Sequence, residues 1–137
     1  MSTRQRVENI IIGTLLDLGD HYDDCRGYIT EDMFMDETNR RIYGLITKMK
    51  DEGYKHTDPA SIFERFGEAV LDIVARMCEL CNEFSFECRK IRHNEKISIY
   101  NSLNGTNYPI ANVEFIDYIR SFINSKIEHE KRSREHT

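Results

Sequence analysis

The sequence is poor in the residues that end strands and interrupt helices. Its 137 residues include only 2 prolines and 7 glycines, whereas an all-β domain needs turn residues about every 8–12 positions. Apolar runs are short, as at Ile10-Ile11-Ile12, and none approaches the about 20 residues that span a bilayer. The first six residues lack the apolar stretch of a secretory signal. These absences argue against a β fold and a membrane-spanning helix, and they predict a cytoplasmic protein with no membrane partner.

Positive charge is also in short supply. Lys and Arg total 19 against 24 Asp and Glu, which gives a formal net charge of −5 at pH 7. Proteins whose main task is to hold phosphate backbones are usually basic, so we predict that direct nucleic-acid binding is weak or absent. The deficit lies in the first half of the chain, where Arg26 is the only Lys or Arg among many carboxylates between residues 17 and 37. Such a band is typical of a solvated face, although it would also suit a basic partner.

The catalytic motifs that can be recognised from sequence are missing. The chain contains no P-loop, no G-x-G-x-x-G, no H-E-x-x-H and no G-x-S-x-G. The chain therefore lacks the sequence patterns that bind a nucleotide phosphate, a dinucleotide or a catalytic zinc ion, and the pattern that surrounds an acyl-enzyme serine. We therefore predict no catalytic residue, no cofactor and no metal, and no enzymatic activity in this chain.

The four cysteines do not form a convincing metal-binding pattern. Cys78 and Cys81 make a C-x-x-C, and Cys88 and His93 follow. A structural zinc site normally uses two short-spaced pairs joined by a longer gap, and here the pair lies within a helical pattern with no second pair. We favour buried apolar thiols, with zinc at these four residues as the weaker alternative.

Apolar residues recur with the helical period along most of the chain. This periodicity predicts an all-α fold, a compact bundle of six to seven helices. The expected elements are helices near residues 4–18, 36–53, 59–67, 68–82 and 113–134, with a short capped turn at 30–34. Residues 84–103 fit either one long helix or a helix with a break. We predict a helical globular domain over residues 1–110 and a C-terminal helix over residues 111–137.

Two groups of side chains in the second half are candidates for binding. The C-terminal helix, capped by Asn112, is apolar on two adjoining faces. Its self-association candidates are Phe115, Ile119, Phe122 and Ile123, with a place in the chain's own core as the alternative. A basic cluster offers possible nucleic-acid contacts through Arg89, Lys90, Arg92 and Lys96, with Phe86 and Tyr100 near enough to stack on bases. This cluster supports an alternative function as a small helical nucleic-acid-binding or regulatory protein.

One arrangement of residues resembles a known family. In order along the chain stand Glu8, Gly13-Thr14-Leu15-Leu16, Asp32-Met33-Phe34, Arg40-Arg41-Ile42-Tyr43, Gly53 and Asp58. Over roughly residues 6–80 this arrangement resembles the N-terminal domain of DnaB-type replicative DNA helicases. A second stretch, from Asn112 to Arg120, is similar to the start of that family's long hairpin helix, the first arm of a dimerisation hairpin. The family's RecA-like ATPase domain has no counterpart in this chain, which is either a part of such a helicase or a stand-alone relative.

The resemblance implies a role in DNA replication that does not involve catalysis. In that family the N-terminal domains pair through a helical hairpin and form a collar on the helicase hexamer, where primase docks. The expected partners are therefore a second copy of the chain, as a dimer or a multiple of dimers, and a primase C-terminal domain or a helicase loader. If the chain is part of a longer protein, that protein would be an ATP-dependent DNA helicase of the primosome.

Overall fold

The computed structural model describes residues 1–110 and 113–135, and in this part of the chain helices are joined by turns without any strand. The predicted all-α fold is therefore confirmed. The α-helices are α1 (Thr3–Asp17), α2 (Tyr22–Cys25), α3 (Glu37–Asp51), α4 (Pro59–Phe66), α5 (Val74–Phe84), α6 (Phe86–Asn104) and α7 (Phe115–Glu135). Short 3-10 helices lie at Gly19–His21, Glu31–Met33 and Gly67–Ile73. Among the described residues no helix has the length and apolar character needed to cross a membrane.

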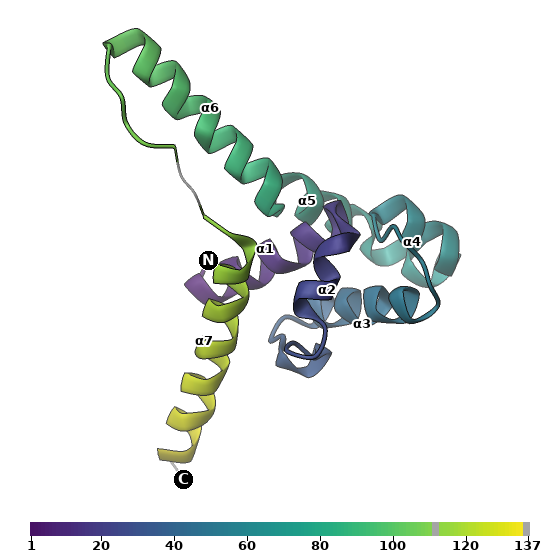
Figure 1. The fold of residues 1–137 in the computed structure, drawn as a ribbon. Coiled ribbons are helices and arrows are strands. Elements are labelled where there is room, and N and C mark those ends of the chain that lie inside the picture. The colour runs from purple at the N-terminus through teal and green to yellow at the C-terminus, as the bar shows by residue number, and fades with distance from the viewer. Residues whose placement is uncertain (111–112, 136–137) are drawn as a thin grey trace.

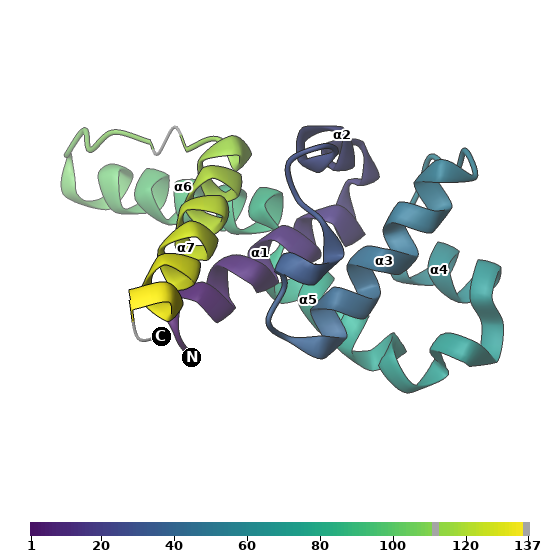
Figure 2. The ribbon, with the colours of Figure 1, turned by 90° about the horizontal axis from the view of Figure 1, so that it is seen from below.

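The first helix runs through the centre of the molecule. Every residue of α1 from Glu8 to Leu16 is buried, and α1 packs against α3, α5, α6 and α7 (Figure 2). A helix covered on several sides needs apolar residues beyond a single stripe. The run Ile10-Ile11-Ile12 and the pair Leu15-Leu16, all almost inaccessible to solvent, meet this requirement. The central position of α1 places its residues against each of the surfaces described below.

Local hydrogen bonds explain where the other helices of the body begin. The Asp36 carboxylate accepts a hydrogen bond from the Asn39 N–H at the start of α3. Asp58 caps α4 in the same way, and Pro59 occupies the first turn, where a missing N–H costs nothing. The short turn at Glu31–Met33 delivers Phe34 into the core, where it is fully buried. These starts agree with the sequence expectations, whereas the predicted cap Asn112 lies outside the described residues.

Two expected segments differ in detail from the structure. The helix expected over residues 68–82 is divided into the 3-10 helix Gly67–Ile73 and α5. Gly67 has φ 60°, a left-handed conformation that ends α4 and suits glycine. Of the two alternatives for residues 84–103, one long helix or a helix with a break, the structure shows a single helix, α6. The backbone of Ser85 separates it from α5.

Helices α6 and α7 give the molecule its open shape. The far half of α6 projects away from the body, and α7 lies across α1 and extends past it (Figure 1). The loop after α6 is held to the helix by Asn101, whose side chain bonds the backbone N–H and C=O of Tyr108. The inner side of α7 belongs to the same core as α1. The division into a globular domain over residues 1–110 and a C-terminal helix over residues 111–137 stays a prediction.

Candidate functional site

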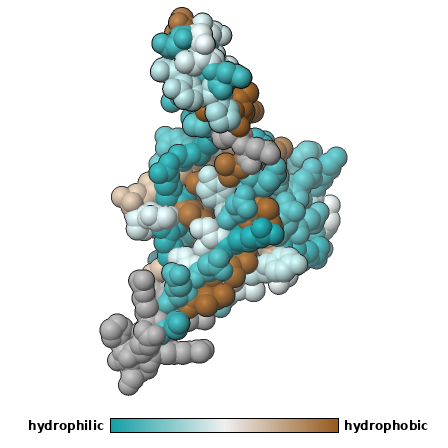
Figure 3. All heavy atoms as spheres, turned by 60° about the vertical axis from the view of Figure 1, so that its left-hand side comes forward, coloured by the Kyte–Doolittle hydropathy of each residue, from teal (hydrophilic) through white to brown (hydrophobic). Residues whose placement is uncertain are grey.

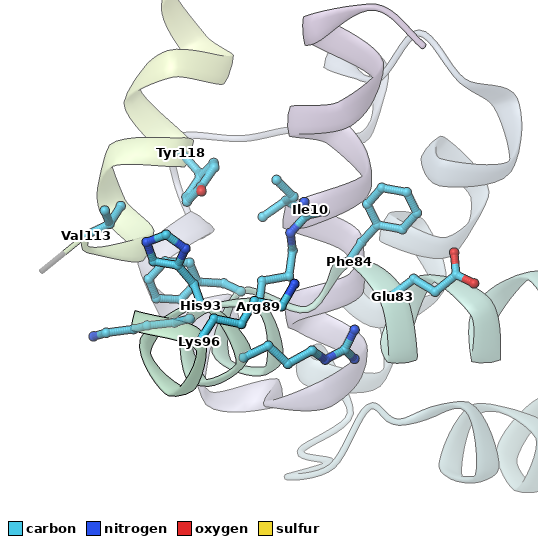
Figure 4. Close-up of a pocket in the computed structure, with 11 residues that line it drawn as sticks. Ile10, Glu83, Phe84, Arg89, His93, Lys96, Val113 and Tyr118 are labelled. Carbon is cyan, nitrogen blue, oxygen red and sulfur yellow. The ribbon is translucent and has the colours of Figure 1, made fainter. Parts of the chain in front are cut away.

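The basic residues singled out in the sequence line one pocket. Its volume is about 490 Å³, and it lies where the first half of α6 faces α1 and the start of α7 (Figure 4). From α6 it is lined by Phe86, Arg89, Lys90, Arg92, His93 and Lys96, and from other segments by Ile10, Glu83, Phe84, Val113 and Tyr118. We call this the basic pocket. All four predicted cations therefore line the same pocket. His93, which the sequence suggested only as a weak candidate zinc ligand, lines it as well.

The cations of the basic pocket are held by aromatic rings and a carbonyl. The Arg89 guanidinium lies 5.7 Å from the centre of the Phe84 ring, and the Lys90 ammonium lies 5.7 Å from that of Phe86. Arg92 donates a hydrogen bond of 2.6 Å to the carbonyl of Asn82. Among the described residues none of the four predicted cations forms an ion pair. The pocket therefore combines these four cations with one carboxylate, that of Glu83, and with apolar walls.

Hydrogen bonds to α1 fix the start of α6, and with it the position of the basic pocket. The Phe86 N–H, an amide at the first turn of α6, donates to the Thr14 hydroxyl at 2.8 Å. The neighbouring Ser85 hydroxyl donates to the Asp17 carboxylate at 2.6 Å. Ser85 is fully buried. These bonds satisfy polar groups at a helix junction that would otherwise be orphaned.

Most of the predicted self-association residues lie in the chain's own core. Phe115, Ile119 and Phe122 of α7 are 4%, 1% and 0% exposed. Phe122 packs on the Phe34 ring, with centroids 4.9 Å apart. Ile123 is only partly buried at the edge of the same contact. In this conformation three of the four side chains hold α7 on the body and are covered, so they reach a second copy only if α7 leaves α1.

Exposed apolar side chains gather elsewhere. Ile116 and Ile127 of α7 are 39% and 57% exposed, and with Ile123 they stand at i, i+7 and i+11, which places them on one side of the helix. A second group lies on the projecting part of the molecule, residues 95–110, which we call the arm (Figure 3). Its exposed apolar members are Ile99, Tyr100, Leu103, Tyr108 and Ile110. Sequence periodicity could not separate these faces from the buried ones.

The cysteines are free thiols in different environments. Cys25 is buried, and desolvation raises its pKa to about 12. Burial also raises the pKa of the Cys81 thiol, to about 11, whereas Cys78 is exposed. Among the described residues no three Cys, His, Asp or Glu side chains are grouped as a metal ion would need. The prediction of buried apolar thiols is right for Cys25 and wrong for Cys78, which is exposed, while Cys81 and Cys88 are half-buried.

Buried polar residues were the part of the structure that sequence reasoning missed. Glu8 is 1% exposed, and its carboxylate accepts from the N–H groups of Met35 and Asp36 at 3.0 and 3.2 Å. It also accepts from the Asn39 side chain at 3.3 Å. In the sequence Glu8 stands out only through the family resemblance, because residues as far apart as Glu8 and Asp36 leave no local pattern. Its role in the structure is to join α1 to the start of α3.

Comparison with known proteins places these elements in a family. Residues 1–85 match the family model described as the DnaB-like helicase N terminal domain. The match takes in α1 to α5 and the junction at Ser85, and ends where α6 begins. No curated protein and no solved structure matches the chain significantly. Because the family model covers residues 1–85, more than half of the chain, this protein belongs to the DnaB-like helicase N-terminal domain family.

Proposed function

We propose that the chain is an assembly and docking module of a replicative DNA helicase and has no catalytic activity of its own. The observation that carries the proposal is the match of residues 1–85 to the helicase N-terminal domain family. The absence of a P-loop from the sequence supports a role without ATP hydrolysis. In this role the chain would contribute contacts between subunits and a binding surface for other replication proteins.

The self-association that we propose uses α7. Phe115, Ile119 and Phe122 would anchor this helix on the body, since they are buried there. Ile123, together with the exposed Ile116 and Ile127, would then face a second copy. An exposed apolar stripe on a long helix buries readily against the same stripe of a partner. The further partners would be a primase C-terminal domain or a helicase loader.

Light scattering across a concentration series up to tens of micromolar tests the self-association. We expect dimers or multiples of dimers, and we expect Ile116→Ser with Ile127→Ser to shift the chain towards monomers. Ile99→Ser, which removes an equally exposed isoleucine from the arm, is the matched control and should leave the mass unchanged.

Binding of the primase C-terminal domain or of a loader from the same genome is measured in parallel by calorimetry. A chain that is monomeric at every concentration and binds neither protein would refute the assembly and docking role.

A further inference from the structure

We propose that the basic pocket is a phosphate-binding site that takes a nucleotide, either free or as part of single-stranded nucleic acid. The sequence indicated these cations only as possible nucleic-acid contacts, without a pocket, and the family match ends before the residues of α6 that line it. The inference goes beyond assembly of a helicase collar and stands or falls independently of it.

The first argument is the unpaired charge in the basic pocket. Elsewhere in the chain several arginines pair with neighbouring carboxylates, as Arg41 does with Asp72 at 2.7 Å and Arg65 with Glu52 at 2.8 Å, although single exposed lysines such as Lys48 and Lys55 form no ion pair within the described residues. The chain has more carboxylates than cations, so partners are not scarce. Yet none of the predicted cations of the pocket forms an ion pair within the described part of the chain. Four cations against the single carboxylate of Glu83 in one pocket leave a net positive charge that attracts anions.

The second argument is the arrangement of these groups along α6. Arg89, His93, Lys96 and Tyr100 stand at i, i+4, i+7 and i+11, which places them on one side of the helix. At a rise of about 1.5 Å per residue, the cations from Arg89 to Lys96 extend over about 10 Å. A linear array of this kind can contact successive phosphates of one strand. The labelled side chains of α6 in Figure 4 lie along the same wall of the pocket.

The third argument concerns the part of the ligand that is not phosphate. The pocket has apolar walls from Ile10 and Val113, a half-buried ring from Tyr118 and a volume of about 490 Å³. This volume falls within the about 300–1,000 Å³ usual for small-ligand sites. Tyr100 continues the basic side of α6; its ring contacts the Tyr108 ring, with centroids 5.7 Å apart, but the side chain is 51% exposed and so keeps surface on which a base can stack. Phe86, the other stacking candidate from the sequence, is only 5% exposed and is therefore unsuited to this role.

A row of basic side chains that ends in a partly exposed aromatic ring favours nucleic acid over an acidic peptide. Bases stack on aromatic side chains while the backbone follows a basic groove, whereas an acidic peptide gains little from Tyr100. The acidic surface of the remaining chain repels phosphates, which would confine binding to the pocket. We expect an affinity that is modest and strongly dependent on salt.

Fluorescence anisotropy with a labelled oligothymidylate, measured from low to physiological salt, tests the proposal. Arg89→Gln with Lys96→Gln should weaken binding at least tenfold at low salt. The plot of log affinity against log salt should become less steep by about 0.7 for each lost phosphate contact. Arg6→Gln with Lys55→Gln removes the same charge from exposed positions outside the pocket and should change the affinity less than twofold. Far-UV circular dichroism checks the fold of each variant, and Lys96→Glu alone, at an exposed side chain, serves if the double variant does not fold.

Titration with a free mononucleotide distinguishes the two sources of phosphate. Competition at concentrations close to those of the oligonucleotide would assign the site to free nucleotides, and much weaker competition would assign it to a strand. Three results would overturn the proposal. They are no binding of either probe at low salt, equal losses in the pocket and control variants, and tighter binding of a glutamate-rich peptide of the same charge.

Discussion

Phe122 of α7 packs on Phe34 with the ring centroids 4.9 Å apart, and both side chains are completely buried. The two residues are far apart in the sequence, and Phe34 enters the core from the short turn that precedes α3. Their contact therefore joins the C-terminal helix to the N-terminal body. A helix fixed in this way leaves only its other side exposed, so the self-association proposed above would have to use that side.

Truncation of Phe122 should strongly destabilise the fold. We expect Phe122→Ala to lower the free energy of unfolding by about 3–5 kcal/mol, the usual cost of deleting a buried phenyl group. Urea denaturation at a concentration where the chain is monomeric measures this directly. Ile127→Ala, which truncates a side chain that is 57% exposed on the same helix, should change stability by no more than about 0.5 kcal/mol. Equal small effects of the two variants, with loss of dimers for Phe122→Ala, would instead place Phe122 between copies.

Removing the charge of Glu8 should separate α1 from the start of α3. In Glu8→Gln an amide NH₂ replaces one acceptor oxygen and faces the backbone N–H of Met35 or Asp36. A buried N–H left without a partner costs about 1–3 kcal/mol, and we expect a loss of that size in thermal or urea denaturation. Glu37→Gln removes the same charge from an exposed position in the first turn of α3. It should cost less than about 1 kcal/mol, and a comparable loss would show that only the helix dipole matters.

The start of α6 illustrates what sequence periodicity can and cannot predict. The pattern indicated helices on both sides of residue 85 but not where the break falls. The break depends on Thr14 and Asp17, which bond Phe86 and Ser85 from about 70 residues earlier in the chain. Such partners leave no mark in the local pattern. The helix starts at Asp36 and Asp58 were predictable because their caps lie only three residues from the N–H groups that they accept from.

The candidate surfaces were likewise predictable only where their residues lie close together in the sequence. The basic cluster could be read from the sequence because its members lie within one helical stretch, whereas Ile10 and Tyr118, which complete the pocket, come from other helices. The apolar faces of α7 were also visible, but periodicity does not say which face another part of the chain covers. Phe115 and Ile116 are neighbours in sequence, yet one is buried and the other 39% exposed.

Gly13 is required by the close packing of α1 on α5. A Cβ at this position would lie 3.1 Å from both the carbonyl carbon of Leu80 and that of Phe84, and closer still to the Leu80 oxygen. Because these are backbone atoms, the helices would have to move apart. We expect Gly13→Ala to lower the free energy of unfolding by about 1–3 kcal/mol, even though alanine favours helix formation.

Gly44→Ala is the matched control for Gly13→Ala. Gly44 also lies within a helix, but its added Cβ would meet only the end of the exposed Glu31 side chain, which can rotate away. This variant should be stabilised by about 0.5–1 kcal/mol because glycine loses more backbone entropy on folding. Urea denaturation of both variants checks the contrast, and a destabilised Gly44→Ala together with a neutral Gly13→Ala would contradict it.

The thiols should react in the order of their accessibility. At pH 8 the exposed Cys78 should react rapidly with a disulfide reagent such as Ellman's reagent. Cys25 should react only as fast as the protein opens, because it is buried and its raised pKa, about 12, leaves almost no thiolate. Between the ordinary thiol pKa and pH 12 the unfolded state loses this proton and the native state keeps it, so stability should fall as pH rises through that window. Mass spectrometry of a time course identifies the modified residues.

Urea at a concentration that unfolds the chain should make all four thiols react at similar rates, which is the control for intrinsic reactivity. Cys78→Ser should remove the fast phase and leave the slow phases unchanged. A Cys25 thiol that reacted as fast as Cys78 in the native protein would show that α2 opens readily. Because Tyr22 of α2 contacts the Tyr43 ring and donates a hydrogen bond of 3.2 Å to the Thr47 hydroxyl, both on α3, that result would also require this contact between α2 and α3 to be transient.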